Sequence, residues 1–268
     1  MIGILAAAAL SGVVVGIASG LLGIGGGMVM VPLFRLGFAF AAIEATATSL
    51  FAIIPTSISG AITHLRNRSC LPAVGVAAGI AGAFTSPLGV HLANASPNWA
   101  IMLAAGLVIS WSAYKMLKKG LKKQAHPATD GGRPQEQEPS SAKPTRRQIV
   151  IGACSGLIAG AISGYVGVGG GFIMVPLFTS FGGLSMKQGS GTSLVAVAIL
   201  AIPGAITQFV LGNVNVAIGL AVAVGSVPGA ILGANLAKRI PDRQLRLTFG
   251  AMLLLAAASI VFNEFAGI

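Results

Sequence analysis

The two halves of the chain carry the same motif. Residues 20–34 read GLLGIGGGMVMVPLF and residues 164–178 read GYVGVGGGFIMVPLF. At the same offset of 144 residues, and without a gap, the tripeptide TSL and the tetrapeptide GAIT each recur further along both halves. A repeat of this length predicts two copies of one folding unit, because similar sequences must build similar elements.

The composition places both copies in a lipid bilayer. Hydrophobic residues make up 54% of the 268 residues and charged residues only 9%, against about 25% charged residues in a soluble domain. Runs such as residues 2–22 and 216–236 have the roughly 20 apolar residues that a spanning helix needs. They lack the alternation of polar and apolar residues that is typical of β-barrel strands. We therefore expect an all-α polytopic membrane protein.

Composition also divides the chain into three parts: a first transmembrane repeat at 1–117, a linker at 118–148 and a second transmembrane repeat at 149–268. Nine of the 17 Lys and Arg residues lie between Lys115 and Arg147, so much of the net charge of +11 belongs to this short segment. The linker is rich in Pro, Gly, Gln and charge, which predicts a disordered segment. A cytoplasmic tether is favoured over a segment that binds nucleic acid or anionic lipid.

Each repeat is expected to contain a glycine-broken segment followed by three spanning helices. The expected elements of the first repeat are 2–22, the break 23–27, 28–43, 45–65, 71–93 and 97–117. Those of the second repeat are 149–166, the break 167–171, 172–185, 188–211, 214–237 and 242–262.

The placement of basic residues indicates that the repeats have inverted topology. Cytoplasmic loops collect Lys and Arg. The loop after residue 65 carries Arg66 and Arg68, whereas the equivalent loop 211–215 is uncharged. The next loop shows the reverse, since 94–99 is uncharged and its counterpart carries Lys238, Arg239, Arg243 and Arg246.

With the basic loops and the linker in the cytoplasm, both termini are expected on the outer face, together with the single base Arg35. Each broken segment then enters the membrane and returns, either as a re-entrant segment or as a hairpin of two short helices. Inverted repeats with broken segments at matching positions are typical of secondary transporters.

The glycine breaks are candidate anion sites. A helix resumes after each break, and its first turn has unpaired N–H groups and the positive end of the helix dipole. The alternative is that the glycines only allow close helix packing. The spacing matches neither a dinucleotide fingerprint nor a Walker loop, since Met28 and Phe172 stand where glycine is needed. The candidate residues are Gly23, Gly25, Gly26, Gly27, Gly167, Gly169, Gly170 and Gly171.

Hydroxyl side chains follow both breaks and are candidates for the same site. Thr48, Ser49, Thr192 and Ser193 either donate to the ligand or bond back to their own helices, and Thr63 and Thr207 are weaker candidates. Glu44 and His64 are the candidates for proton coupling, although His64 and His91 are expected near the membrane interface. No metal site is expected, and Cys70 and Cys154 are interpreted as structural thiols without redox chemistry.

The repeated motif GxGGG[MF]xMVP, with a Ser-containing helix after it, resembles the TauE/SafE family of sulfite exporters over about 230 residues. The resemblance implies a bacterial-type inner-membrane permease for sulfite or a related small sulfur oxyanion. It adds Pro32 and Pro176 to the expected binding elements.

The expected function is therefore a secondary transporter, with export as the activity that names the family, and the alternative is an anion channel with paired re-entrant segments. Enzymatic activity is not expected, because neither repeat has paired carboxylates, a His cluster or an activated nucleophile. The expected partners are the oxyanion and the lipid bilayer, without nucleic acid or a cofactor. A homo-oligomer remains an open alternative.

Overall fold

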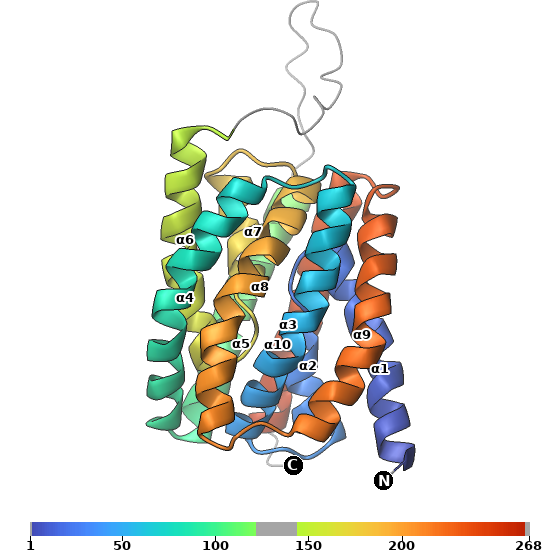
Figure 1. Ribbon diagram of the computed structural model, residues 1–268, viewed down its shortest axis with the longest axis vertical. Helices are drawn as coiled ribbons and strands as arrows, with labels where there is room; N and C mark the ends of the chain where they lie inside the picture. The colour runs from blue at the N-terminus through green and yellow to red at the C-terminus, as the bar shows by residue number, and fades with distance from the viewer. Residues whose placement is uncertain (1, 122–143, 266–268) are drawn as a thin grey trace, which may run out of the picture.

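The computed structural model describes residues 2–121 and 144–265, and every regular element in these residues is a helix (Figure 1). The elements are α1 (Ile2–Leu22), α2 (Gly27–Pro32), the π-helical turn η1 (Leu33–Gly37), α3 (Ala42–Arg66), α4 (Pro72–Asn94), α5 (Asn98–Leu121), α6 (Arg146–Val166), α7 (Gly171–Ser180), α8 (Met186–Val210), α9 (Val216–Ala237) and α10 (Asp242–Phe265).

Among the described helices, seven are long and apolar enough to cross a membrane, namely α1, α3, α4, α5, α6, α8 and α9. Many large apolar side chains on their outer surfaces are exposed, such as Phe84 and Leu107, and in a membrane protein such side chains face lipid. The expectation of an all-α polytopic membrane protein is confirmed. Disorder was predicted for the whole linker, 118–148, and residues 122–143 of it lie outside the described residues. At both ends the prediction is wrong, because α5 continues to Leu121 and α6 begins at Arg146.

The two repeats interlock instead of forming separate bundles. Helix α1 of the first repeat packs along α9 of the second, and the equivalent helix α6 packs along α4 of the first. The last helices of the repeats, α5 and α10, pack against each other. Helices α3 and α8 lie in contact and also touch α9 and α4, respectively, so the middle of the bundle is shared by both repeats (Figure 1).

Rows of glycine residues allow close packing in the two helix pairs that join the repeats, α1 with α9 and α6 with α4. A Cβ placed on Gly16 of α1 would stand 2.2 Å from the carbonyl oxygen of Ser226 in α9. In the other pair, a Cβ on Gly156 of α6 would stand 2.0 Å from the carbonyl oxygen of Ala78 in α4. Small residues spaced by four let helix backbones approach closely in membranes. The sequence contains this signal at 12, 16 and 20 and at 152, 156, 160 and 164, but our sequence analysis did not use it.

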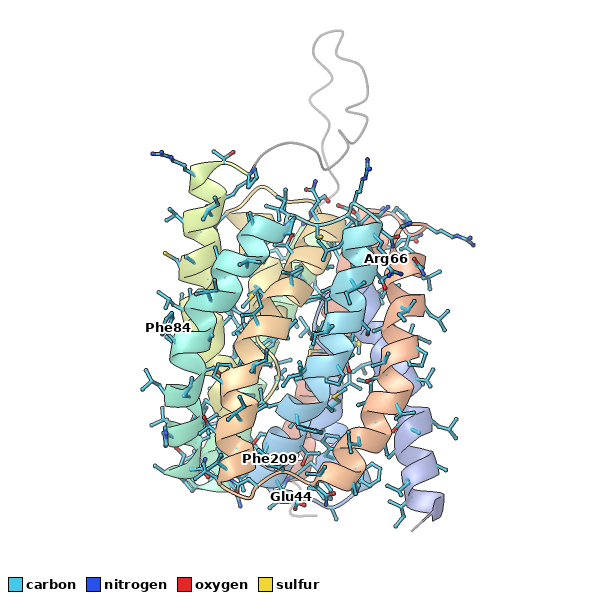
Figure 2. All side chains as sticks on the ribbon, viewed as in Figure 1. Glu44, Arg66, Phe84 and Phe209 are labelled. Carbon is cyan, nitrogen blue, oxygen red and sulfur yellow. The ribbon has the colours of Figure 1, made fainter. Side chains whose placement is uncertain are left out.

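Equivalent helices of the two repeats run in opposite directions. Figure 2 shows Arg66, the last residue of α3, at one end of the molecule, and Phe209, near the end of α8, at the other. The end with Arg66 also holds the starts of α6 and α8 (Figure 1). Glu44, in the first turn of α3, lies at the opposite end (Figure 2), where α1 begins.

The segments after the two breaks differ from the continuous runs that were predicted at 28–43 and 172–185. In the first repeat, α2 is six residues long and continues as the π turn η1, and no helix covers residues 38–41. The equivalent α7 continues as a single ten-residue helix to Ser180. Around η1, the rings of Phe34, Phe38 and Phe40 contact one another, which places the irregular backbone in an aromatic cluster.

Candidate functional site

The two glycine breaks have the same backbone conformation. Gly23, Gly25 and Gly26 have φ values of 76°, 80° and 91°, and Gly167, Gly169 and Gly170 have values of 73°, 85° and 65°. This region of φ is readily open only to glycine. All of these glycines are buried, so the repeated GxGGG sequence builds two matching turns inside the bundle.

The two breaks lie against each other. A Cβ placed on Gly27 would stand 2.7 Å from the carbonyl carbon of Val168, and one on Gly171 would stand 2.4 Å from the carbonyl oxygen of Gly23. The side chain of Ile53, from the middle of α3, packs against both breaks, because its Cδ1 atom would contact a Cβ on Gly27 or Gly169. The structure therefore brings together two segments that are 144 residues apart in the sequence.

A short helix starts directly after each break. In the first repeat, the amides of Val29 and Met30 donate to the carbonyl of Gly26, at 3.0 Å each. In the second repeat, the amides of Ile173 and Met174 donate to Gly170 in the same way, at 3.1 and 3.0 Å. The first amides of such a helix have no intrahelical acceptor. Pro32 and Pro176, which the family resemblance implies, are buried within these short helices.

Serine hydroxyls from the central helices hold the carbonyl groups of the breaks. Ser193 of α8 donates to the carbonyl of Gly23 at 2.7 Å, and Ser49 of α3 donates to the carbonyl of Gly167 at 2.9 Å. Each serine thus bonds to the break of the other repeat. Ser193 also bonds to the carbonyl of Ser190 in its own helix at 2.8 Å, which was one of the two expected alternatives, whereas the bonds to the breaks were not among them.

The neighbouring threonines make a second symmetric pair of contacts. Thr192 accepts a hydrogen bond from the amide of Leu71, and Thr48 accepts one from the amide of Asn215, both at 3.0 Å. These bonds fix the start of α4 to α8 and the start of α9 to α3. Thr63 and Thr207 bond back to carbonyl groups one turn earlier in their own helices.

His64 lies in the last turn of α3, near the end of the helix as expected, and is buried in the protein, with 1% of its surface exposed. Its Nε2 atom lies 2.9 Å from the carbonyl oxygen of Gly20, and its Nδ1 atom lies 2.8 Å from the hydroxyl of Ser69. His64 is buried because α1, through Gly20, and α8, through Gly191, both pack on the last turn of α3. His91 is exposed.

The second repeat has an amide pair where the first has a histidine and a serine. At the offset of 144, Gln208 corresponds to His64 and Asn213 to Ser69. The side-chain amide of Asn213 donates to the Oε1 atom of Gln208 at 2.7 Å. The His64–Ser69 contact and the Gln208–Asn213 contact are therefore equivalent, and only the first contains a titratable side chain.

The remaining titratable candidates have ordinary structural partners. Glu44 accepts a long hydrogen bond of 3.4 Å from the side chain of Asn215. Burial raises the pKa of the Cys70 thiol to about 11, which keeps it protonated at neutral pH and unsuited to nucleophilic chemistry. Within the described residues, no group of three or more His, Cys, Asp or Glu side chains is placed to hold a metal ion.

Five buried serine hydroxyls in the described residues have no hydrogen-bond partner, and the sequence analysis had not selected any of them. They are Ser19, Ser57, Ser86, Ser112 and Ser163. Ser19 and Ser163 are equivalent residues of the two repeats, and each lies four positions before the first glycine of a break. Only the position of Ser19 and Ser163 carried a signal in the sequence, because serine recurs there at the repeat offset.

Comparison with known proteins identifies relatives over almost the whole chain. Residues 8–260 match the family described as sulfite exporter TauE/SafE. The chain is 28% identical over 233 residues to the probable membrane transporter protein YdhB of Bacillus subtilis, covering 86% of this chain and 89% of the relative. It is 22% identical over 260 residues to the probable membrane transporter protein YunE of the same organism, covering 94% and 95%.

A probable membrane transporter protein of Xylella fastidiosa is 25% identical over 262 residues, covering 96% of this chain and 95% of the relative. No solved structure matches the chain. The family match spans both repeats, both glycine breaks and the central helices α3 and α8. The chain therefore belongs to the sulfite exporter TauE/SafE family of membrane transporters.

Proposed function

We propose that the protein is a secondary transporter that exports sulfite or a small organosulfur oxyanion, bound where the two glycine breaks meet. The observation that carries this proposal is the mutual contact of the breaks, in which Gly27 lies against Val168 and Gly171 against Gly23. A single small ligand at this contact would touch both repeats. That is the arrangement expected for a substrate site at the interface of two repeats.

The chemistry of the breaks favours an anion. Amides at the start of a helix and the helix dipole both attract negative charge, and the start of the ten-residue helix α7 belongs to the second break. The described part of the chain has no cluster of acidic side chains around the breaks that would favour a cation. A pyramidal or tetrahedral oxyanion can accept several hydrogen bonds from such neutral donors.

The packing favours alternating access over a continuous pore. The breaks touch each other directly, and the side chains of Ile53 and Val197 pack against Gly25. An anion that reaches the break amides must therefore separate contacts already made between the repeats. A channel would need a path that stays open, so saturable flux distinguishes the transporter from the channel.

His64 is the stronger of the two candidates for proton coupling. It is buried and contacts Gly20, three residues before the first break, so a change in its charge acts close to the site. Glu44 lies at the opposite end of α3 (Figure 2). The counterpart of His64, Gln208, does not titrate, which would confine coupling through this pair to one side of the protein.

Flux into and out of proteoliposomes that contain the purified protein tests the proposal. We expect saturable transport of radiolabelled sulfite, with competition by organosulfur anions and little competition by chloride. A pH gradient should alter this flux in the wild type and not in His64→Gln, while Glu44→Gln serves as the comparison. The proposal fails if no sulfur oxyanion moves under either a pH gradient or a membrane potential.

A further inference from the structure

The hydroxyls that the sequence analysis chose for the ligand are already bonded to the protein. Ser49 and Ser193 donate to carbonyl groups of the breaks, and Thr48 and Thr192 accept from backbone amides. The buried hydroxyls without a protein partner are therefore the ones available to a ligand. A buried hydroxyl without a hydrogen bond is unfavourable, so an isolated one in a protein core needs an explanation.

Two of the serines that carry these hydroxyls lie next to the first break. Ser57 of α3 is completely buried, and a Cβ placed on Gly25 would stand 3.1 Å from its Oγ atom. Ser19 of α1 is 1% exposed, and a Cβ on Gly26 would stand 3.6 Å from its Cβ atom. Two serines from different helices, each with an unpartnered hydroxyl, thus lie next to this glycine pair.

The second break has one matching hydroxyl and lacks the other. Ser163 is equivalent to Ser19, is completely buried and also has no partner for its hydroxyl. Its carbonyl accepts from the amide of Gly167 at 2.8 Å, as that of Ser19 does from Gly23. The residue equivalent to Ser57 is Ala201. The hydroxyl donors are therefore distributed unequally between two otherwise similar breaks.

We infer that Ser57 and Ser19 are substrate-binding residues that hydrogen-bond a small oxyanion at the first break, with Ser163 as the matching donor from the second repeat. The inference rests on the proposed function. A serine hydroxyl can donate to an unprotonated oxygen of the anion and accept from a protonated one. The site thus accommodates a small oxyanion in either protonation state without a charged side chain. Because two of the three hydroxyls belong to the first repeat, the anion binds more strongly to that repeat.

Alanine variants with matched controls test this assignment. Ser57→Ala is compared with Ser59→Ala in the same helix, where the hydroxyl already bonds to the carbonyl of Thr56 at 2.8 Å. Ser19→Ala is compared with Ser11→Ala, where the hydroxyl bonds to the carbonyl of Ala8 at 2.8 Å. The readouts are sulfite flux into proteoliposomes at varied concentration and thermal unfolding in detergent with and without sulfite.

Loss of a hydrogen bond to a charged ligand weakens binding roughly tenfold or more. We expect Ser57→Ala and Ser19→Ala each to raise the KM for sulfite roughly tenfold, with a similar loss of the stabilisation by sulfite. Without sulfite, their unfolding temperatures should equal or exceed that of the wild type, because an unsatisfied polar group has been removed. Both control variants should keep the wild-type KM.

The outcomes separate this inference from the proposed function. Wild-type flux together with an unchanged KM in Ser57→Ala and Ser19→Ala overturns the inference and leaves the transporter intact, as would be the case if these hydroxyls bound only buried water. Absence of wild-type flux for all sulfur oxyanions overturns both. If Ser57→Ala does not fold, Ser57→Cys keeps a similar volume with a weak donor, and the same rise in KM is expected.

Discussion

Gly23 combines two constraints at a single residue. Its φ of 76° belongs to the left-handed region, and a Cβ at this position would stand 2.4 Å from the Cα atom of Ser190 in α8. Gly167 shows the same combination against Thr46 of α3. Each break therefore needs glycine both for its backbone conformation and for its contact with the opposite repeat.

The two constraints at Gly23 can be measured separately. Gly212 has nearly the same φ, 74°, but no atom lies within 4 Å of a Cβ placed there. Gly212→Ala should cost about 1 kcal/mol of stability from conformation alone and retain transport. Gly23→Ala should cost roughly 2 kcal/mol more, because its methyl group overlaps α8, and should abolish transport. Thermal unfolding in detergent and sulfite flux provide the two measurements, and equal effects of the two variants would contradict this account.

The sequence indicated the glycine breaks and some of the hydroxyl side chains near them, but not the partner of each side chain. The serines and threonines after each break could be identified because they recur at the repeat offset. Their hydrogen-bond partners could not, since Ser49 bonds to Gly167 and Ser193 to Gly23, across the interface between the repeats. The burial of His64 has the same origin. A pattern within one repeat does not reveal contacts that the other repeat supplies.

At the scale of helices, α1 and α9 form one of the two close glycine contacts between the repeats. The glycine stripe of α1 lies on the backbone of α9, and Gly225, Gly229 and Gly233 of α9 lie on the backbone of α1. Side chains other than glycine would separate the two backbones. Because α1 carries the first break at its end, its distance from α9 also sets the position of the break.

Gly16→Ala tests this role of the stripe. Its methyl group would stand 2.2 Å from the carbonyl oxygen of Ser226, so the helices must separate and stability should fall by roughly 2 kcal/mol. Gly3→Ala in the same helix has no atom within 4 Å and should leave stability unchanged or slightly higher. Fluorescence-detected gel filtration after heating ranks the variants, and a Gly16→Ala protein as stable as Gly3→Ala would argue against close packing of α1 on α9.

Element positions followed the apolar runs closely, because the length of a spanning helix is set by the bilayer. The expected run 45–65 became α3 (Ala42–Arg66), and the expected run 188–211 became α8 (Met186–Val210). The return segments were less predictable. The turn η1 and the left-handed Ala39, with φ of 55°, depend on how the aromatic rings pack around Phe34, which apolar composition alone does not encode.

At the scale of the whole molecule, basic residues from several helices lie at one end. In the described residues, Arg66 marks this end in Figure 2, and Lys187, near the start of α8, donates to the carbonyl of Lys238 at 2.9 Å. The start of α10 is held there as well, because Asp242 accepts from the amide of Met186 at 2.8 Å. Interlocked repeats cannot reorient independently, so one charged end orients both.

This arrangement predicts a single orientation in the inner membrane, with the basic end in the cytoplasm. Green fluorescent protein inserted within residues 124–140 should therefore fluoresce, and alkaline phosphatase inserted there should be inactive. Phosphatase fused to the C-terminus, or inserted after Ser96 in the uncharged loop between α4 and α5, should be active. The physical reason is that Lys and Arg are retained on the cytoplasmic side during insertion, whereas uncharged loops cross freely.

The same fusions also test whether the loop arginines or the linker bases determine the orientation. Replacing Arg66, Arg68, Arg243 and Arg246 with glutamine removes half of the eight bases that lie outside the segment Lys115–Arg147, while the linker bases remain. If the bases of the loops are needed to select the orientation, this variant should yield mixed reporter signals at both positions. If it keeps the wild-type pattern, the linker bases suffice. Phosphatase activity from the linker of the wild-type protein would contradict the predicted orientation, and the cytoplasmic placement of His64 would have to be abandoned with it.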